Sequence, residues 1–377
     1  MKIANVEAVP FHAERDTAAV TGTAGSPAKL QASASVYRWA EHYPVLYSTR
    51  FETALVRVTL DSGLAGWGEA QAPVAPEVAC TIIDRILAPI LVGADFDIET
   101  LWWRMYSAMR VRGQTGGFML DAIAGVDLAL WDLAGKIAGK PVSALIGEAR
   151  SRVPAYLSGL PGGTAEGVRP WIDAGFRHVK IFHQADVDRL RRDCDAVRSM
   201  GAQVAVDALW RLTLDGAPSF VGSLSPLLWL EAPLAPESAR QHGDLAQRTN
   251  VPIAIGETYR TTFELEPFFE ARAMSIVQPD LGRTGITEGL RIAREAARRG
   301  IDVVPHVSIA MGPQLAAAIH FAAALPNCSM LEFNPTVVET ANRYLESPLR
   351  VEAAQYVVPD APGLGVQSPS LSRIGFS

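Results

Sequence analysis

From about residue 150 onward, short apolar runs alternate with longer stretches whose apolar positions repeat at helical spacing. Eight of these runs are rich in β-branched or aromatic residues and barely alternate between apolar and polar positions: VPAYL, HVKIF, QVAVDA, LLWLEA, PIAIGE, MSIVQPD, IDVVPH and SMLEF. Strands of this kind are typical of parallel sheets that helices cover on both faces. The pattern therefore predicts eight parallel strands joined by helices, and this strand count favours a (β/α) barrel over an open sheet.

The first third of the chain has a different pattern. ETALVRVTLDSGLAGWGEA alternates and turns at DSG, which predicts an antiparallel hairpin. Helical spacing follows in EVACTIIDRILAPIL, DIETLWWRMYSAMR and FMLDAIAGVDLALWDLAGKIAG, the last of which reaches the stop signals Gly139 and Pro141. These features predict a separate α+β domain over residues 1–125, ahead of a barrel over residues 126–345.

Two segments lack a clear period. Residues 15–35 are rich in Ala, Ser, Thr and Gly and lead into YRWAEHYPVLYSTR, so we expect a lid loop over about residues 15–50. The tail carries turn chemistry in PDAPGLGV, and we expect residues 346–377 to return to the first domain.

Composition and charge narrow the class of protein. A chain of 377 residues, 49% hydrophobic and 20% charged, is typical of a globular protein the size of an enzyme. The net charge of -6 argues against nucleic-acid binding. The three cysteines lie far apart, which predicts neither a disulfide framework nor a zinc site and suggests a reducing compartment. We see neither a signal peptide nor a membrane span, and therefore expect a cytoplasmic protein without a membrane partner.

Charged or ionisable side chains stand near the ends of seven successive predicted strands. Each follows the previous one by about one strand-and-helix unit, and the active sites of such barrels lie at the carboxyl ends of the strands. Taken singly, each carboxylate could be a helix N-cap or the partner of a nearby arginine. Taken together, we expect them to ring one mouth of the barrel: Lys180, Asp207, Glu231, Glu257, Asp280, His306 and Glu332.

The residue types at this mouth indicate its chemistry. Five carboxylates against one lysine and one histidine leave negative charge that is costly in a partly dry site unless a cation binds. Asp207, Glu231 and Glu257 follow consecutive strands, and such all-carboxylate ligation suits Mg²⁺, with Mn²⁺ as the second choice and zinc disfavoured. Asp280 beside His306 would orient a general base. A base that faces a metal-bound carboxylate predicts removal of the proton alpha to that carboxylate.

The motifs VAVDA, LLWLEAPL, IAIGET, VQPDLGRTG, VVPHVS and MLEF, with GWGEA and DLALWDLAGK upstream, occur in a specific order and spacing. In these motifs the chain resembles the mandelate racemase subgroup of the enolase superfamily, over essentially its whole length. The resemblance implies an α/β fold in which an α+β capping domain covers a modified TIM barrel, (β/α)₇β, with one Mg²⁺ ion; a Lys or His base acting with Mg²⁺ is the known chemistry of this superfamily. It also implies metal ligands at Asp207, Glu231 and Glu257, a His306–Asp280 dyad, and Glu332 bonded to the substrate carboxylate or enediolate.

One departure from the subgroup's pattern bears on the reaction. The subgroup has Lys-x-Lys on its second strand, with the second lysine as the base opposite the histidine, whereas HVKIFH places Phe182 there, two residues after Lys180. The subgroup usually has a polar residue two positions beyond the first metal ligand, and this chain has Leu209 at that position instead. His183 is expected to point away from the side that Lys180 and Phe182 share. One face of the site is therefore predicted to lack a base, which disfavours a racemase.

A dehydratase can work with one base. His306 can take the alpha proton and, as imidazolium, protonate the leaving beta hydroxyl on the same face, which gives a 2-keto-3-deoxy acid. The pattern is similar to the rhamnonate dehydratases, which also lack the second lysine, so we expect an acid-sugar dehydratase, a carbon–oxygen lyase. Lys180 would stay near the enediolate as a cation.

Other functions fit parts of the pattern. A racemase, epimerase or cycloisomerase of the same superfamily, acting on a sugar acid or lactone, is the first alternative. A sugar-acid-binding protein without catalysis is another, because Phe182 replaces a usual catalytic group. A retaining glycosidase would use two carboxylates about 5 to 5.5 Å apart and no metal.

The lid is the expected source of specificity. Its polar and aromatic residues Arg38, His42, Tyr43 and Arg50 are the predicted contacts to distal hydroxyls or to a second carboxylate of the substrate. The expected partners are therefore a small-molecule sugar acid and, in a homo-oligomer, further copies of the chain.

Overall fold

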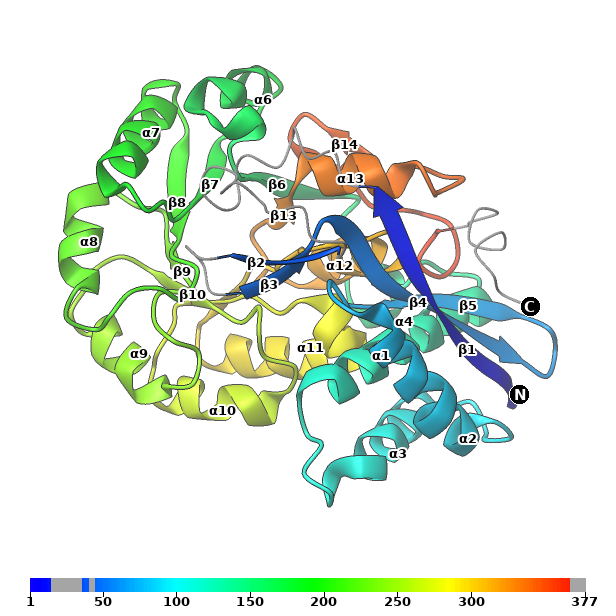
Figure 1. Cartoon of the computed structure of the whole chain (residues 1–377). Helices are drawn as coiled ribbons and strands as arrows, with labels where there is room; N and C mark the ends of the chain where they lie inside the picture. Colours follow the sequence, from blue (N-terminus) through cyan, green and yellow to red (C-terminus); the bar gives the residue numbers. More distant parts are fainter. Residues whose placement is uncertain (15–35, 41–44, 367–377) are drawn as a thin grey trace.

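The structure is a computed structural model and describes residues 1–14, 36–40 and 45–366 of the chain. Figure 1 shows two parts: a cap of strands and helices from the N-terminal residues, in blue to cyan, and a larger ring of strands and helices, in green to orange. Within the described ranges, no helix is both long enough and apolar enough to cross a membrane.

Eight strands form the parallel ring. Neighbours from β6 to β12 pair in sequence order, and β13 returns to pair with β6. An isolated parallel bridge between Val303 of β12 and Cys328, just before β13, links the two ends of the ring. The strands are β6 (Arg152–Ser158), β7 (His178–Phe182), β8 (Gln203–Asp207), β9 (Leu230–Glu231), β10 (Ile253–Ile255), β11 (Ile276–Val277), β12 (Asp302–Val303) and β13 (Leu331–Phe333). The (β/α)₇β architecture is thus confirmed, although the strands from β9 onward are shorter than predicted.

A helix follows each of the first seven barrel strands and covers the outside of the ring (Figure 1). Polar side chains cap several of these helices, and Asp186, Ser238, Thr261 and Asn334 each accept a hydrogen bond from a backbone N–H of the first turn. The helices are α6 (Arg169–Asp173), α7 (Val187–Ser199), α8 (Ala217–Leu224), α9 (Ala239–Ala246), α10 (Thr262–Glu270), α11 (Leu281–Arg298) and α12 (Pro313–Ala324), with α13 (Pro335–Asn342) after β13. Short turns at η2 (Pro161–Gly163) and η3 (Ala165–Val168) precede α6.

The cap is a three-stranded antiparallel sheet in the order β1-β4-β5, covered by helices. The predicted hairpin is present as β4 (Arg50–Leu60) and β5 (Ala65–Ala70), and β1 (Ile3–Glu14) adds the third strand. The helices are α1 (Pro76–Ile82), the π-helical turn η1 (Ile83–Leu87), α2 (Ala88–Leu91), α3 (Ile98–Arg110) and α4 (Gly117–Ala138), followed by the single turn α5 (Ser143–Ile146).

Helix α4 joins the cap to the barrel. It lies so close to β5 that a Cβ on Gly68 would be 2.0 Å from the carbonyl oxygen of Gly125, which explains the glycines in GWGEA. It also packs on α11 of the barrel. The domain boundary placed between residues 125 and 126 lies inside this helix.

The C-terminal segment touches both parts. The hairpin of β14 (Val351–Glu352) and β15 (Gln355–Val357) pairs with the start of β6. Farther along, the backbone N–H of Leu364 donates to Asp132 of α4 over 2.8 Å.

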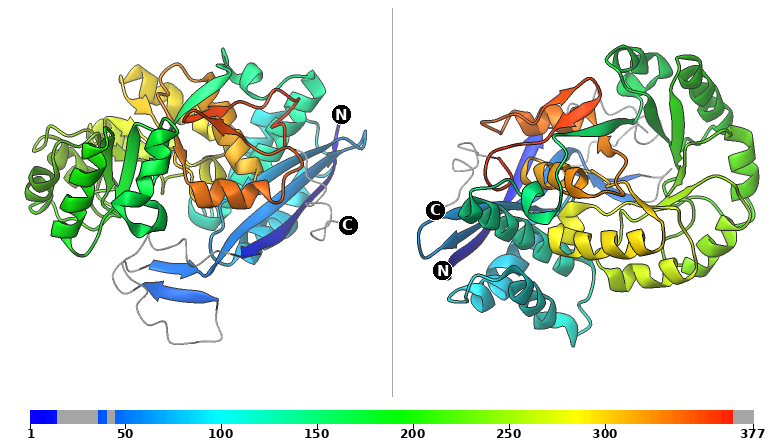
Figure 2. Two further views of the ribbon diagram at one scale, coloured as in Figure 1. Left: turned by 90° about the horizontal axis from the view of Figure 1, so that it is seen from above. Right: turned by 180° about the vertical axis from the view of Figure 1, so that it is seen from behind.

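The segment of the predicted lid loop that follows residues 15–35 contains the paired strands β2 (Tyr37–Ala40) and β3 (Val45–Ser48), which were not predicted. The Tyr37 hydroxyl accepts the backbone N–H of Ala75 over 3.0 Å, which ties the hairpin to the cap. In Figure 1 the hairpin lies in front of the ring of barrel strands, and the view from above in Figure 2 shows it set apart from them.

Candidate active site

The structure brings all seven predicted strand-end residues together at one mouth of the barrel. Ion pairs link Lys180 to Glu231 and Glu332, and His306 to Asp280, Glu257 and Glu332. Asp207 joins them because its carboxylate, with those of Glu231 and Glu257, forms a group whose oxygens lie within 4.8 Å of one another. The local cause is the parallel ring, which ends every strand at the same edge.

The group of Asp207, Glu231 and Glu257 has the chemistry of a site for a hard divalent cation. Burial and the neighbouring charges of Glu231 and Glu257 raise the pKa of Asp207 well above its usual value. Three adjacent carboxylates without sufficient positive charge are costly, and a cation bound by their oxygens removes that cost. The side chains present therefore fit the predicted magnesium site.

Each of these three carboxylates is held by donors from the protein. The backbone N–H of Leu209 donates to Asp207 over 2.8 Å. Glu231 Oε2 accepts from the indole of Trp229 over 2.9 Å and from the Gln278 amide over 2.8 Å, and Glu257 Oε1 accepts from the Trp210 indole over 2.8 Å. Donors of this kind fix the direction of a ligand's oxygens before the metal binds.

Lys180 is a buried cation at this mouth. Its side chain is 0% exposed, and Nζ contacts Glu231 and lies 2.8 Å from Glu332 Oε1. Burial alone would lower its pKa, but the charges of Glu231 and Glu332 outweigh burial and raise that pKa well above the usual value. Lys180 is therefore an ammonium ion, not a free base.

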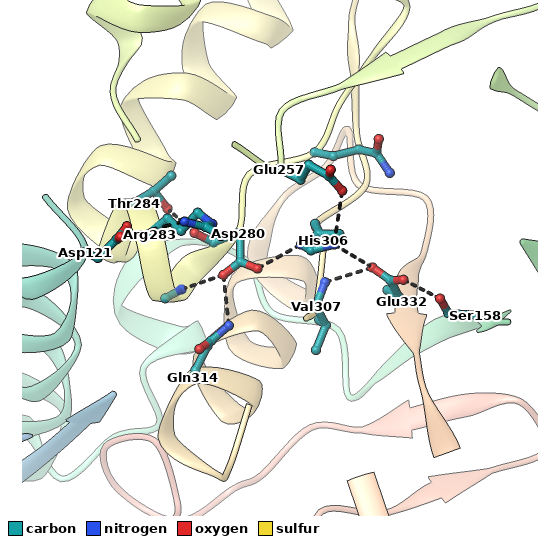
Figure 3. A network of polar contacts seen from close by, with 12 residues as sticks. Asp121, Ser158, Glu257, Asp280, Arg283, Thr284, His306, Val307, Gln314 and Glu332 are labelled. Carbon is teal, nitrogen blue, oxygen red and sulfur yellow. Dashed lines mark hydrogen bonds and ion pairs between the residues drawn. The ribbon is translucent and has the colours of Figure 1, made fainter. Parts of the chain in front are cut away.

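His306 and Asp280 form a hydrogen-bonded pair (Figure 3). His306 Nδ1 is 2.8 Å from Asp280 Oδ2, and the other oxygen of Asp280 accepts from the Gln314 amide and the backbone N–H of Gly282, each over 2.9 Å. Asp280 is also the N-cap of α11, so the same carboxylate caps a helix and orients His306. This bond leaves His306 Nε2 to face the site.

The charges around His306 control its protonation. Burial lowers its pKa, but the carboxylates of Glu332 and Glu257 and the bond to Asp280 outweigh burial and raise the pKa to about 10. Nε2 lies 3.2 Å from Glu257 Oε2. A cation shared by the carboxylates would oppose this effect and bring the imidazole towards the range where it can accept a proton.

Glu332 is fixed by three donors. Its Oε1 accepts from Ser158 Oγ over 2.5 Å, and its Oε2 accepts from the backbone N–H of Val307 over 2.9 Å (Figure 3). Oε1 also accepts from Lys180. Burial raises its pKa, but the charges of Lys180 and His306 dominate and lower the pKa to about 2. Glu332 is therefore a fixed carboxylate between the lysine and the histidine.

Phe182 places an aromatic ring beside Lys180, whose Nζ lies 5.5 Å from the centroid of that ring. Phe182 stands two residues after Lys180, at the sequence position of the subgroup's second lysine, and its place opposite His306 remains a prediction. His183 stacks on Phe220 of α8, with ring centroids 5.5 Å apart, so its ring lies on the helix-facing side of the strand.

The structure describes only two of the four predicted lid contacts. Arg38 is on β2, where Nη1 donates to the Tyr37 carbonyl over 3.2 Å, and Arg50 begins β4, where Nε lies 4.0 Å from Glu14 Oε1. His42 and Tyr43 lie outside the described residues. Contact between these four and a substrate remains a prediction.

Sequence reasoning missed the residues that orient the site: Ser158, Trp210, Trp229, Gln278 and Gln314. Trp229 and Gln278 stand two residues before Glu231 and Asp280, on the same side of their strands. That alternation was the available signal for both. Ser158, Trp210 and Gln314 offered none, because their contacts depend on loops and on the approach of distant strands.

Comparisons with known proteins agree with this geometry. The sequence model of the mandelate racemase and muconate lactonizing enzyme N-terminal domain matches residues 36–147, and that of the enolase C-terminal domain-like family matches residues 163–369. The described cap and barrel thus each correspond to a known domain.

Several characterised proteins are similar over most of the chain. An arabinonate dehydratase of Saccharolobus solfataricus is 32% identical and aligns with 86% of this chain and 89% of its own. A D-galactarolactone cycloisomerase of Agrobacterium fabrum is 31% identical, with 85% and 90% covered, and a D-galactonate dehydratase of Ralstonia nicotianae is 31% identical, with 82% and 87% covered.

A solved structure gives the same result. A member of the enolase superfamily from Agrobacterium tumefaciens superimposes with a TM-score of 0.93 and 32% identity, covering 99% of this chain and 98% of that one. Fold, domain matches and relatives agree, and the chain belongs to the mandelate racemase subgroup of the enolase superfamily.

Proposed function

We propose that the protein is a Mg²⁺-dependent dehydratase of a sugar acid, which removes the proton alpha to the carboxylate and eliminates the beta hydroxyl to give a 2-keto-3-deoxy acid. The observation that carries this proposal is the His306–Asp280 pair at the mouth, taken together with Phe182, which lies beside Lys180 at the sequence position of the subgroup's second lysine. The arabinonate and galactonate dehydratases among the relatives support the substrate class and the reaction.

Each residue of the site has a separate role in the proposed reaction. Asp207, Glu231 and Glu257 would hold Mg²⁺, which supplies positive charge to the substrate carboxylate as the alpha proton leaves. His306 Nε2 takes that proton while Asp280 holds the opposite ring nitrogen. Lys180 adds a fixed positive charge near the developing enediolate, and Glu332 keeps Lys180 in place.

Elimination then completes the reaction. The electron pair of the broken C–H bond passes through the enediolate, the beta C–O bond breaks, and the imidazolium of His306 protonates the leaving hydroxyl to give water. The enol that remains tautomerises to the 2-keto acid. Because the same histidine takes one proton and gives it to a group on the same face, no second base is required.

An epimerase fits the site less well. Exchange of configuration needs an acid and a base on opposite faces of the alpha carbon. Lys180 is buried between two carboxylates that hold it protonated, and His183 stacks outside the ring of strands. Neither residue is placed to serve as the second base.

A cycloisomerase is the second candidate, favoured by the relative of that name. A single base that removes an alpha proton would serve such a reaction as well, so Phe182 does not separate the two. Their products do, because a dehydratase product has lost one water and carries a keto group, whereas an isomerase product has the mass of its substrate.

A substrate screen tests the proposal. The purified chain is incubated with Mg²⁺ and a set of mono- and diacid sugars and their lactones, and keto-acid formation and product mass are measured. We expect a keto acid that is one water lighter than its substrate, with no turnover after treatment with EDTA. Isomeric products alone would replace the dehydratase by a cycloisomerase, and activity in EDTA would favour a glycosidase-like pair of carboxylates.

Proton exchange tests the single base. Both alpha epimers of the best substrate are incubated in D₂O with Mg²⁺, and the alpha proton is followed by NMR. We expect exchange or elimination with one epimer. Comparable exchange of both epimers would require a second base and would favour an epimerase, and exchange of neither would favour a binding protein without catalysis.

A further inference from the structure

Trp210 makes an unusual contact at the mouth. It lies on the loop after β8, shortly beyond Asp207, and its indole Nε1 donates to Glu257 Oε1 over 2.8 Å. Trp229 makes the same kind of bond to Glu231, but it is 1% exposed and belongs to the barrel interior. Trp210 instead reaches Glu257 from a loop, across the end of the intervening strand β9.

The backbone holds Trp210 in this position. Leu209 and Trp210 have φ values of 53° and 59°, a left-handed conformation that side-chain-bearing residues adopt at a cost. The N–H of Leu209 donates to Asp207 Oδ1 over 2.8 Å, and the N–H of Trp210 donates to the carbonyl of Ala232, which follows Glu231, over 2.6 Å. The turn is therefore locked to residues beside two of the proposed ligands.

Glu257 stands between competing partners. Its Oε1 is bonded to Trp210, and its Oε2 lies 3.2 Å from His306 Nε2. The indole bond and the contact with His306 thus hold the two oxygens of Glu257 from two directions. Without the indole bond, Oε1 would lose its donor, and the carboxylate would be free to turn about its contact with His306 and out of the ligand group.

We propose that Trp210 is a positioning residue whose indole N–H holds Glu257 in the orientation that binds the metal. The inference rests on the proposed metal site, and it assigns a role to a residue that contacts a ligand and not the metal. Tyr259 and His242 support the indole, with ring centroids 6.4 and 6.1 Å from that of Trp210.

Calorimetric titration of the whole, metal-free chain with MgCl₂, without substrate, tests this role. Trp210→Phe keeps the aromatic packing but removes the donor, and we expect its Mg²⁺ affinity to fall about 10- to 100-fold, the usual effect of losing a partner of a metal ligand. The matched control is Trp103→Phe, since Trp103 Nε1 donates to Glu99 over 2.9 Å on the exposed surface of α3. This control should bind Mg²⁺ as the wild type does.

A second variant separates the hydrogen bond from the ring. Trp210→Gln carries a side-chain N–H without an aromatic ring, so it should bind Mg²⁺ more tightly than Trp210→Phe. Trp210→Gln also tests the proposal if Trp210→Phe does not fold. In that case, a Mg²⁺ affinity of Trp210→Gln near that of the wild type supports the proposal.

The outcomes distinguish the two proposals. Wild-type affinity in Trp210→Phe would overturn the role of Trp210 and leave the metal site intact, and so would an affinity in Trp210→Gln as low as in Trp210→Phe. No Mg²⁺ binding by the wild-type chain would overturn the metal site and the role of Trp210 together. Failure of the sugar-acid screen with normal Mg²⁺ binding would affect the proposed reaction alone.

Discussion

Buried carboxylates lie in two regions of the chain, and the two groups differ in their hydrogen-bond partners. At the seam, where β5 and α4 of the cap meet the barrel, each carboxylate has donors on both oxygens. Glu69 accepts the N–H groups of Met311 and Gln314, and Asp132 accepts those of Trp67 and Leu364. Asp121 and Asp127 of α4 also accept hydrogen bonds on both oxygens, Asp121 from Arg260 and Asp127 from Thr287.

At the mouth the carboxylates face one another. Among the described residues, the side chain of Asp207 accepts one hydrogen bond, from Leu209, and the carboxylates of Glu231 and Glu257 lie beside it. The charge of Lys180 only partly offsets their effect on the pKa of Asp207. Burial is similar in the two regions, since Asp207 is 2% exposed and Asp132 is 0% exposed. The difference lies in the partners. The seam carboxylates have protein donors on both oxygens and join the parts of the protein, whereas the group of Asp207, Glu231 and Glu257 at the mouth needs a cation.

The largest effect is expected from His306→Asn. Loss of the general base should lower turnover by about 10⁴-fold, the upper range for such a residue, and should abolish alpha-proton exchange in D₂O. The fold and the Mg²⁺ affinity should persist, because the ligand group does not include His306. Steady-state rates and NMR exchange measure the effect, and retained exchange would show that another group removes the proton.

Asp207→Asn tests the mouth side of the comparison. Mg²⁺ affinity in calorimetry should fall by about 10²-fold or more, since a charged ligand is lost. The melting temperature in EDTA should stay the same or rise, because the substitution removes repulsion from Glu231 and Glu257. A clear fall in the melting temperature of the metal-free protein would mean that Asp207 is a structural residue like those of the seam.

His306 at the mouth and His320 on α12 differ as their regions do. Burial lowers the pKa of His320 on α12 to about 4, whereas the mouth carboxylates raise that of His306. His320 Nε2 lies 3.1 Å from the Leu364 carbonyl, and Nδ1 accepts the N–H of Ser143. A neutral ring satisfies both contacts.

This difference predicts a pH dependence of stability. As the pH falls from about 6.5 to about 4, His320 binds a proton in the unfolded chain but stays neutral in the folded chain, which lowers the free energy of unfolding by roughly 3 kcal/mol. Above pH 6.5 the ring is neutral in both states, and His320 does not change the free energy of unfolding with pH. Melting temperatures across this range should fall less steeply in His320→Gln than in the wild type, and parallel curves would show that His320 does not titrate on unfolding.

Asp132→Asn tests the seam with the smallest expected effect. The NH₂ group of the new amide would face one of the backbone N–H groups of Trp67 and Leu364, so that two donors meet and one hydrogen bond is lost. We expect the free energy of unfolding to fall by about 2 kcal/mol and the melting temperature by roughly 5 °C. Activity per folded molecule should not change. Asp95→Asn is the control, because Asp95 pairs with Lys2 on the exposed surface. Equal melting temperatures for both variants would remove the distinction between seam and surface.

Much of the mouth was predictable because a parallel barrel converts one-dimensional spacing into proximity. A polar residue after each apolar run, from Lys180 to Glu332, was enough to place all seven residues together. The Phe182 substitution was equally visible, since it departs from a motif at a fixed position.

The supporting contacts were not predictable in the same way. Trp210 meets Glu257 only because Leu209 and Trp210 adopt left-handed backbone, which neither residue type favours. The seam was also hidden, because Glu69 and Asp132 bond to backbone N–H groups hundreds of residues away. Backbone donors leave no signature in side-chain patterns.

The pairing of β13 with β6 has a consequence for synthesis of the protein. Lys180 leaves the ribosome early, but Glu332, which pairs with it and with Ser158, lies on the last barrel strand. Until that strand is inserted, the lysine has Glu231 but lacks its second carboxylate partner, and the ring is open. A nascent chain that has folded its cap and its first barrel strands therefore cannot yet carry out the chemistry, and the catalytic centre is completed when the barrel closes.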